Sequence, residues 1–187
     1  MSRLILPSYV VTKDTREQKG WDFDAHHPER RSPRCAGMVI DTLQTGDYSL
    51  VGYTDILTIE RKADFSELWG NYAAKRRPAF EDEMKRMSSI KYAYIVIESS
   101  MTPDILELSP PQFSKGVPGK SLIRWLLNLS IKHGVPVFFA GQCGRKVAQL
   151  IFEEVVRVEK DRWVSRDTKK NQSPSADGPP KGDYFGR

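Results

Sequence analysis

The sequence predicts an α/β fold in which a central mixed sheet is flanked by helices. Over residues 9–158, short apolar and β-branched runs alternate with longer amphipathic stretches, as expected for strands and helices that build one sheet domain. The run at residues 92–97 is almost wholly apolar, which is typical of a strand covered on both faces. We expect one folded domain at residues 1–158 and a disordered tail at residues 159–187.

The first third of the chain is predicted to hold three or four strands. Each candidate combines β-branched, aromatic or aliphatic residues with a turn or a charged residue at one end. A basic loop at residues 20–36, which contains two prolines, separates the first candidate from the second. The candidate strands cover residues 9–13, 39–43, 48–50 and 55–62.

Helical periodicity follows this strand region. Pro78 suits the first turn of the second of two helices, and His133-Gly134 is a common helix ending. The predicted helices lie within residues 64–89, which hold two, and at 121–132 and 145–158; the further strands lie at 92–97 and 135–140. Residues 168–182 are mainly Lys, Asn, Ser, Pro and Gly, which cannot bury enough apolar surface to fold.

The net charge, the cysteines and the lengths of the apolar runs indicate which classes of protein this chain can belong to. The formal net charge of +5 is compatible with nucleic-acid binding, and equally with an ordinary basic surface. Cys35 and Cys143 lack metal-ligand spacing, so zinc is not expected, and a reduced intracellular protein is the simpler interpretation. The chain has no apolar run of about 18 residues, so we expect no membrane span.

Several charged residues are predicted to meet at the ends of strands. Glu60 and Lys62 are two residues apart on one candidate strand, so both side chains point to the same face, and Arg61 points to the other. Asp47 begins the neighbouring strand after a glycine turn, and a short hairpin would place it beside Glu60. Asp14 ends another strand that would join them.

Clustered carboxylates repel one another, and a hard divalent cation relieves that repulsion. Mg²⁺ is commonly bound by one or two carboxylates together with water and substrate phosphate. A lysine on the same face would orient an attacking water or neutralise charge on the phosphate. The alternative is that Glu60 and Lys62 form an exposed ion pair worth under about 1 kcal/mol, which is the usual role of such a pair at a strand end.

Three motifs in order along the chain resemble the XPF family of structure-specific nucleases. They are Asp14-Thr15-Arg16-Glu17, Gly46-Asp47-Tyr48 and Ile59-Glu60-Arg61-Lys62. The residues Arg76, Arg77, Phe80 and Glu83 also resemble the family's helix after the active site, and residues 94–98 resemble the strand behind it. The resemblance spans residues 9–158 and is closest to compact phage and bacterial members.

This resemblance implies a restriction-endonuclease-like fold and a Mg²⁺- or Mn²⁺-dependent cut in branched or flapped DNA. It implies that Asp47 and Glu60 bind the metal, that Asp14 supports them as a further metal ligand, and that Lys62 is a catalytic lysine. Arg61 matches the motif arginine and joins the candidate catalytic set. Its place on the opposite face favours a packing or salt-bridge role.

Two features depart from the family pattern. The acid that usually lies four places after the motif lysine is replaced by Ser66, so Asp64 and Glu67 are both left as candidates for that ligand. The tandem helix-hairpin-helix domain of eukaryotic relatives is also missing after residue 158. Branch recognition is therefore expected to come from the nuclease domain, from the second subunit of a homodimer, or from another protein.

Basic residues near the motifs are candidates for contacting DNA phosphates. The candidate DNA-binding residues are Arg16, Lys75, Arg76 and Arg77. Arg30, Arg31 and Arg34 are interpreted as a solvated loop, and His26-His27 as no metal site. Trp69 and Trp125 are interpreted as core residues, the latter also as possible dimer surface.

A catalytically silent DNA-binding subunit that supports an active nuclease partner is the alternative function. A nuclease acting on RNA or on single strands is a further one.

Overall fold

The computed structural model describes residues 7–23, 34–73, 75–107 and 118–160. Within these residues, six strands form a single sheet in the order β2-β1-β3-β4-β5-β6. The strands are β1 (Tyr9–Asp14), β2 (Cys35–Asp41), β3 (Tyr48–Leu50), β4 (Leu57–Lys62), β5 (Tyr92–Ile97) and β6 (Val137–Phe139). The helices are α1 (Phe65–Tyr72), α2 (Arg77–Met87), α3 (Pro103–Glu107), α4 (Gly119–His133) and α5 (Gly144–Val158), with a short 3₁₀ turn, η1 (Gly141–Cys143), before α5.

The sheet is mixed, as predicted. Strand β3 runs antiparallel to both of its neighbours, β1 and β4. The outer pairs β1–β2, β4–β5 and β5–β6 are parallel. The antiparallel centre brings the end of β1, the start of β3 and the end of β4 to the same edge of the sheet.

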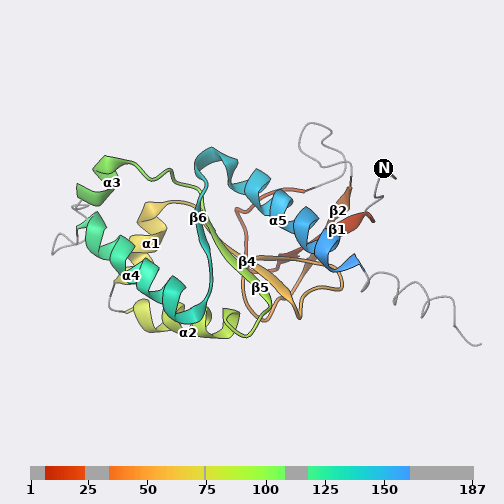
Figure 1. Ribbon diagram of the computed structural model, residues 1–187, viewed down its shortest axis with the longest axis horizontal. Helices are drawn as coiled ribbons and strands as arrows, with labels where there is room; N and C mark the ends of the chain where they lie inside the picture. Colours follow the sequence, from red (N-terminus) through yellow and green to blue (C-terminus); the bar gives the residue numbers. More distant parts are fainter. Residues whose placement is uncertain (1–6, 24–33, 74, 108–117, 161–187) are drawn as a thin grey trace, which may run out of the picture.

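Helices cover the two faces of the sheet unequally (Figure 1). We call the face under α1, α2 and α4 the front face and the face under α5 the rear face. The front core contains Phe65, Leu68, Trp69, Phe80, Met84, Leu122, Leu126 and Leu129. The rear core contains Val11, Tyr48, Leu50, Leu57, Ile59, Phe152 and Val155. Trp69 is therefore a core residue, and Trp125 packs against the front core, as predicted.

Local signals set the helix ends. The Asp64 side chain accepts a hydrogen bond from the Glu67 N–H and caps α1. Pro78 lies in the first turn of α2, as predicted. Helix α4 ends at Gly134, whose φ of 66° is left-handed, a conformation that glycine adopts without strain.

Three elements differ from the prediction. Strand β2 begins at Cys35, inside the predicted loop, and ends at Asp41, because parallel pairing with β1 fixes its register. Helix α3 was not predicted, and a five-residue helix carries too little periodicity to be found in a sequence. Strand β6 is shorter than expected. Residues 161–187 of the predicted tail and the His26-His27 pair lie outside the described residues, whereas Glu159 is described and accepts a 2.8 Å hydrogen bond from Tyr92 Oη.

Strand β5 is not fully covered on both faces, contrary to the prediction from its apolar sequence. Its rear-facing Tyr92 and Tyr94 are half-buried and line a groove of about 480 Å³ beside α5. Among the described residues, α5 is the helix that covers the rear face, and Tyr92 and Tyr94 pack against the rear core without being fully buried in it. Among the described residues, no helix is long and apolar enough to cross a membrane.

Candidate active site

The backbone of the antiparallel centre brings Asp47 next to Glu60. The Asp47 N–H donates a 2.9 Å hydrogen bond to the Ile59 carbonyl, and Tyr48 pairs with Ile59 across the two strands. The Arg61 N–H in turn donates to Asp47 Oδ2 at 2.7 Å. The predicted hairpin contact between Asp47 and the Glu60 region of β4 is therefore present.

The front face of these strands is polar and buried. Thr12, Ser49, Thr58, Glu60 and Lys62 are all at most 5% exposed, and they alternate along their strands with the apolar residues of the rear core. A polar stripe of this kind is costly in a core unless its groups are paired. Its charged end, at Glu60 and Lys62, identifies this stripe as a candidate functional site.

Lys62 is a buried cation held by two carboxylates. Its Nζ lies 2.5 Å from Glu60 Oε1 and 3.3 Å from Glu67 Oε1, and it sits 5.4 Å from the centre of the Phe80 ring. Burial by itself would lower the pKa of Lys62, but the charges of Glu60 and Glu67 outweigh it and raise the pKa. Lys62 is therefore protonated at neutral pH and can neutralise negative charge, but cannot accept a proton.

The two carboxyl groups of the site have raised pKa values. Burial is the main cause of the rise for Asp47, to about 7, against the lowering effects of the Arg61 N–H and the Lys62 charge. Burial also raises the pKa of Glu60 well above its ordinary value. The charge of Glu83, which is half-buried on α2, adds to both shifts. Burial therefore disfavours the ionised form of both carboxyl groups, and a cation bound between them would favour it.

Asp14, predicted as a further metal ligand, has both carboxylate oxygens engaged by protein donors. Its Oδ1 accepts hydrogen bonds from the backbone N–H and Nε of Arg16, and its Oδ2 accepts from Arg16 Nη2 and from the Leu43 N–H at 2.7 Å. Burial would raise the pKa of Asp14, but these hydrogen bonds and the Arg16 charge lower it. With both oxygens occupied by protein donors, Asp14 ties β1 to the loop after β2.

The side chains of Arg16 and Arg61 lie in different surroundings and pair with different carboxylates. The Arg16 side chain is 66% exposed while it contacts Asp14, so it also faces solvent beside the site. Arg61 lies on the rear face, as predicted, where it forms ion pairs with Glu98 and, at 3.8 Å, with Glu17. Arg61 therefore does not point at the front carboxylates.

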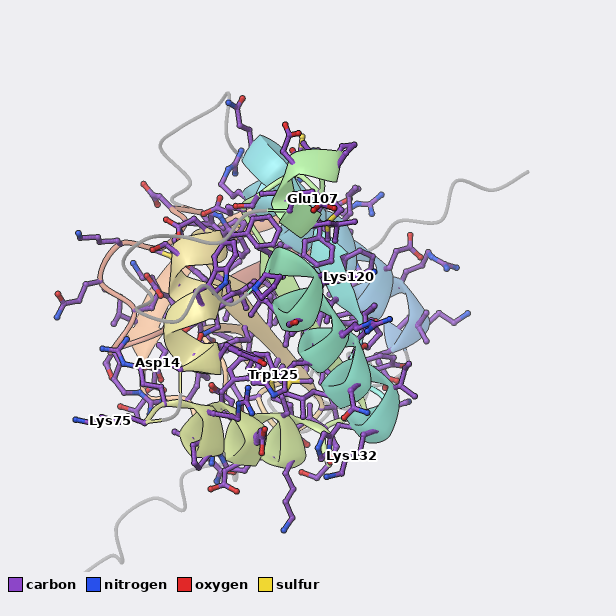
Figure 2. All side chains as sticks on the ribbon, turned by 90° about the vertical axis from the view of Figure 1, so that its left-hand side faces the viewer. Asp14, Lys75, Glu107, Lys120, Trp125 and Lys132 are labelled. Carbon is purple, nitrogen blue, oxygen red and sulfur yellow. The ribbon has the colours of Figure 1, made fainter. Side chains whose placement is uncertain are left out.

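The three basic residues between α1 and α2 are not equivalent. Lys75 and Arg76 are exposed. Arg77, also predicted to contact DNA phosphate, is half-buried, with its guanidinium 4.0 Å from the centre of the Tyr72 ring. Figure 2 shows Lys75 toward the same edge of the molecule as Asp14, at the junction of α1 and α2. Arg34 is described but lies away from this junction, at the start of β2.

Asp64 and Glu67, the two candidates for the remaining ligand, differ in their contacts. Asp64 is occupied as the helix cap, whereas Glu67 contacts Lys62 and is 39% exposed at its side chain. Sequence reasoning named both Glu83 and Glu98 only within the family resemblance, and it gave neither a role in the site. A helical period from Phe80 to Glu83 places both on one side of α2, which was the available signal.

A divalent metal fits the donors that are present. Among the described residues, no group of three or more acidic, His or Cys side chains is arranged to hold a metal. Asp47 and Glu60 nevertheless supply two neighbouring carboxyl groups whose ionised forms a cation would stabilise. Two carboxylates suit Mg²⁺, which keeps waters and takes substrate phosphate as its remaining ligands.

Comparison with known proteins supports the fold. No family model and no curated protein matches the sequence. Among solved structures, XPF from Aeropyrum pernix is similar, with 18% identity over 87% of this chain and 70% of that one, and a TM-score of 0.52. XPF from Aeropyrum pernix in complex with DNA gives 17% identity, 82% and 66% coverage, and a TM-score of 0.50. The predicted XPF-like, restriction-endonuclease-like fold is thereby confirmed.

Proposed function

We propose that this protein is a divalent-metal-dependent endonuclease that hydrolyses phosphodiester bonds in DNA, at branches, flaps or junctions. The observation that carries the proposal is the meeting of Asp47, Glu60 and Lys62 at one end of the antiparallel strands. Both carboxyl groups have raised pKa values, mainly through burial, and a bound cation would stabilise their ionised forms. Neither cysteine forms a disulfide, which favours action inside a cell.

Each residue of the site has a distinct role in this proposal. Asp47 and Glu60 hold Mg²⁺ or Mn²⁺, which when bound lowers the pKa of a water and stabilises charge on the phosphate. Lys62, already a cation, neutralises the charge that develops on the phosphate oxygens. Phe80 and Glu67 keep the Lys62 side chain in place. Arg61 contributes through its backbone N–H, which donates to the Asp47 carboxylate, while its side chain lies on the rear face.

DNA is the proposed substrate for two reasons. A solved structure with this fold is a complex with DNA. The exposed cations Arg16, Lys75 and Arg76 also lie where a phosphate backbone would approach a site beside β1 and α2. The proposed branch specificity rests on the resemblance of the motifs to the XPF family. Cleavage of branched and plain DNA substrates tests it.

The experiment is cleavage of labelled flap, fork, four-way junction and plain duplex DNA, and of RNA versions of the same substrates, in Mg²⁺, Mn²⁺ or EDTA, with binding followed by gel shift. We expect cutting of branched substrates in either metal and no cutting in EDTA. Equal cutting of the plain duplex would remove the branch specificity, and preferred cutting of RNA would change the substrate class. Binding of branched DNA without any cutting would favour the silent DNA-binding subunit.

We also propose that the protein is a homodimer joined through the groove beside α5. The groove is lined by apolar residues from α5, β5 and β6, including Phe138 (40% exposed) and Leu150 (51% exposed). Exposed apolar patches of this kind mark interaction surfaces in soluble proteins.

We expect light scattering to give a dimer mass for the wild type and a monomer mass for Leu150→Glu. Leu127→Glu is the matched control, because Leu127 is similarly exposed, at 48%, on α4. A monomeric wild type, or equal dissociation of both variants, would contradict this interface.

A further inference from the structure

The rear face of the sheet, directly behind the site, carries a cluster of side chains with no direct part in the proposed chemistry. It consists of Trp21, Tyr48, Arg61 and Glu98, and we call it the rear clamp. Tyr48 follows Asp47 in the chain, and Arg61 follows Glu60. Side chains alternate between the two faces of a strand. The rear clamp therefore contacts the same strand segments whose front faces carry the Asp47 and Glu60 carboxylates.

Glu98 is the centre of the clamp. Its Oε2 accepts hydrogen bonds from Arg61 Nε, at 2.7 Å, and from Arg61 Nη2. Its Oε1 accepts a 2.7 Å hydrogen bond from Trp21 Nε1. The Arg61 guanidinium also lies 5.7 Å from the centre of the Trp21 ring. Both Arg61 nitrogens donate to the same oxygen of Glu98, and these charge-assisted hydrogen bonds hold the guanidinium against that carboxylate.

Trp21 joins this ion pair to the other strand of the site. Its ring stacks on the ring of Tyr48, with centroids 4.9 Å apart and an angle of 29° between the planes. Tyr48 is fully buried, and its Oη donates to the Trp21 carbonyl at 3.4 Å. One residue therefore contacts both Tyr48 on β3 and Arg61 on β4.

The clamp is also closed from the side of α5. A side chain at Gly144, the first residue of that helix, would place its Cβ 2.7 Å from Glu98 Cγ and 3.1 Å from Trp21 Cζ2. There is no room for that atom, so the helix start packs directly against Glu98 and Trp21. The side chains of Glu98 and Trp21 therefore have little room to move toward α5.

The clamp reaches the front face through the backbone. The Arg61 N–H holds Asp47 Oδ2 at 2.7 Å, and Arg61 lies between Glu60 and Lys62 in the strand. A shift of Arg61 would therefore move the Asp47 carboxylate and the Glu60 backbone together. Metal sites tolerate small errors in ligand position poorly, and partners beyond the ligands set those positions.

We propose that Trp21 and Glu98 are positioning residues, which fix the separation of the Asp47 and Glu60 carboxylates by clamping Tyr48 and Arg61 from the rear face. The inference rests on the metal site of the proposed function. According to this proposal, the affinity of the front-face site for the metal depends in part on Trp21 and Glu98, whose side chains lie on the rear face.

The test measures Mn²⁺ affinity by calorimetry, at a temperature where circular dichroism shows every variant to be folded. Trp21→Phe keeps an aromatic ring over Tyr48 and removes the N–H that anchors Glu98. Glu98→Gln keeps the size of the side chain and removes its charge. We expect each to raise the Kd for Mn²⁺ by about 10-fold, the lower end of the effect of lost outer-shell partners.

Trp125→Phe is a closely matched control. Trp125 also donates its indole N–H to a glutamate, Glu81 at 3.0 Å, and also lies 5.7 Å from an arginine guanidinium, that of Arg77. It belongs to the α2–α4 side of the front core, where Figure 2 shows it, and its ring packs against the rings of Tyr72 and Phe80. Its substitution should leave the Kd for Mn²⁺ unchanged.

The possible outcomes separate the clamp from the proposed function. Mn²⁺ binding that is lost in Asp47→Asn but unchanged in Trp21→Phe and Glu98→Gln would overturn the positioning role alone. An equal rise in Kd for Trp125→Phe would overturn it as well, because the effect would then be general loosening. A wild type that binds no Mn²⁺, or binding that persists in Asp47→Asn, would overturn both.

Discussion

Asp47→Asn should abolish DNA cleavage and, in the same protein, make the metal-free fold more stable at pH 8. Cleavage should fall by on the order of 10³-fold or more, because loss of an outer-shell partner already costs about 10–100-fold and Asp47 is proposed as a ligand. The amide oxygen can still accept the Arg61 N–H, so the backbone contact is kept. A single-turnover assay on branched DNA in Mg²⁺ measures the loss.

The gain in stability follows from the pKa of Asp47. Its folded-state pKa is about 7, mainly through burial, whereas its ordinary value is 3.8. The folded state therefore binds the proton more tightly, and stability falls as pH rises from about 4 to about 7. Asp47→Asn removes this fall and should raise the free energy of unfolding at pH 8 by about 1–2 kcal/mol. At pH 4 the two proteins should differ little.

Asp82→Asn is the control, since Asp82 is an exposed carboxylate on α2. It should change neither cleavage nor the dependence of stability on pH. Glu60→Gln should repeat the loss of cleavage, because Glu60 is the second proposed ligand. Full activity in Asp47→Asn would exclude it from the site. Loss of activity together with loss of stability would instead assign Asp47 to the fold.

Asp14→Ala should lower the free energy of unfolding by about 2–4 kcal/mol, whereas Asp47→Asn should raise it at pH 8. Asp14 is 1% exposed and accepts from the backbone N–H groups of both Arg16 and Leu43. Its removal leaves these donors without an acceptor, and a buried group left in that state costs about 1–3 kcal/mol. Urea unfolding at pH 7 measures the difference.

The dependence on pH distinguishes Asp14 from Asp47. The folded-state pKa of Asp14 is lowered, so its contribution is complete above the ordinary value of 3.8 and is lost as pH falls through the lowered pKa. The difference between wild type and Asp14→Ala should therefore shrink in acid.

Asp41→Ala is the matched control, because Asp41 is the exposed register partner of Asp14 on β2 and should cost under about 1 kcal/mol. While folded, Asp14→Ala should bind Mn²⁺ within a few-fold of wild type. A complete loss of binding would return Asp14 to the ligand set.

The sequence by itself determined the features that depend on local periodicity. A period of two placed Glu60 and Lys62 on one face and Arg61 on the other, and the structure has this arrangement. Apolar patterning identified all six strands and the four longer helices, with errors mainly at their ends. The glycine turn before Asp47 was enough to predict that β3 begins beside β4.

The tertiary structure alone decided which charged groups are available for chemistry. Asp14 and Asp47 look alike in the sequence, each an acid at a strand end. The Leu43 N–H, 29 residues away, occupies Asp14, while packing under α2 brings Glu83 toward Asp47. Likewise, only the path of α5 shows that Tyr92 and Tyr94 are left half-exposed on an apolar strand. Periodicity fixes the direction of a side chain within its own strand, but donors and coverage come from segments distant in the chain, so their assignment requires the packed structure.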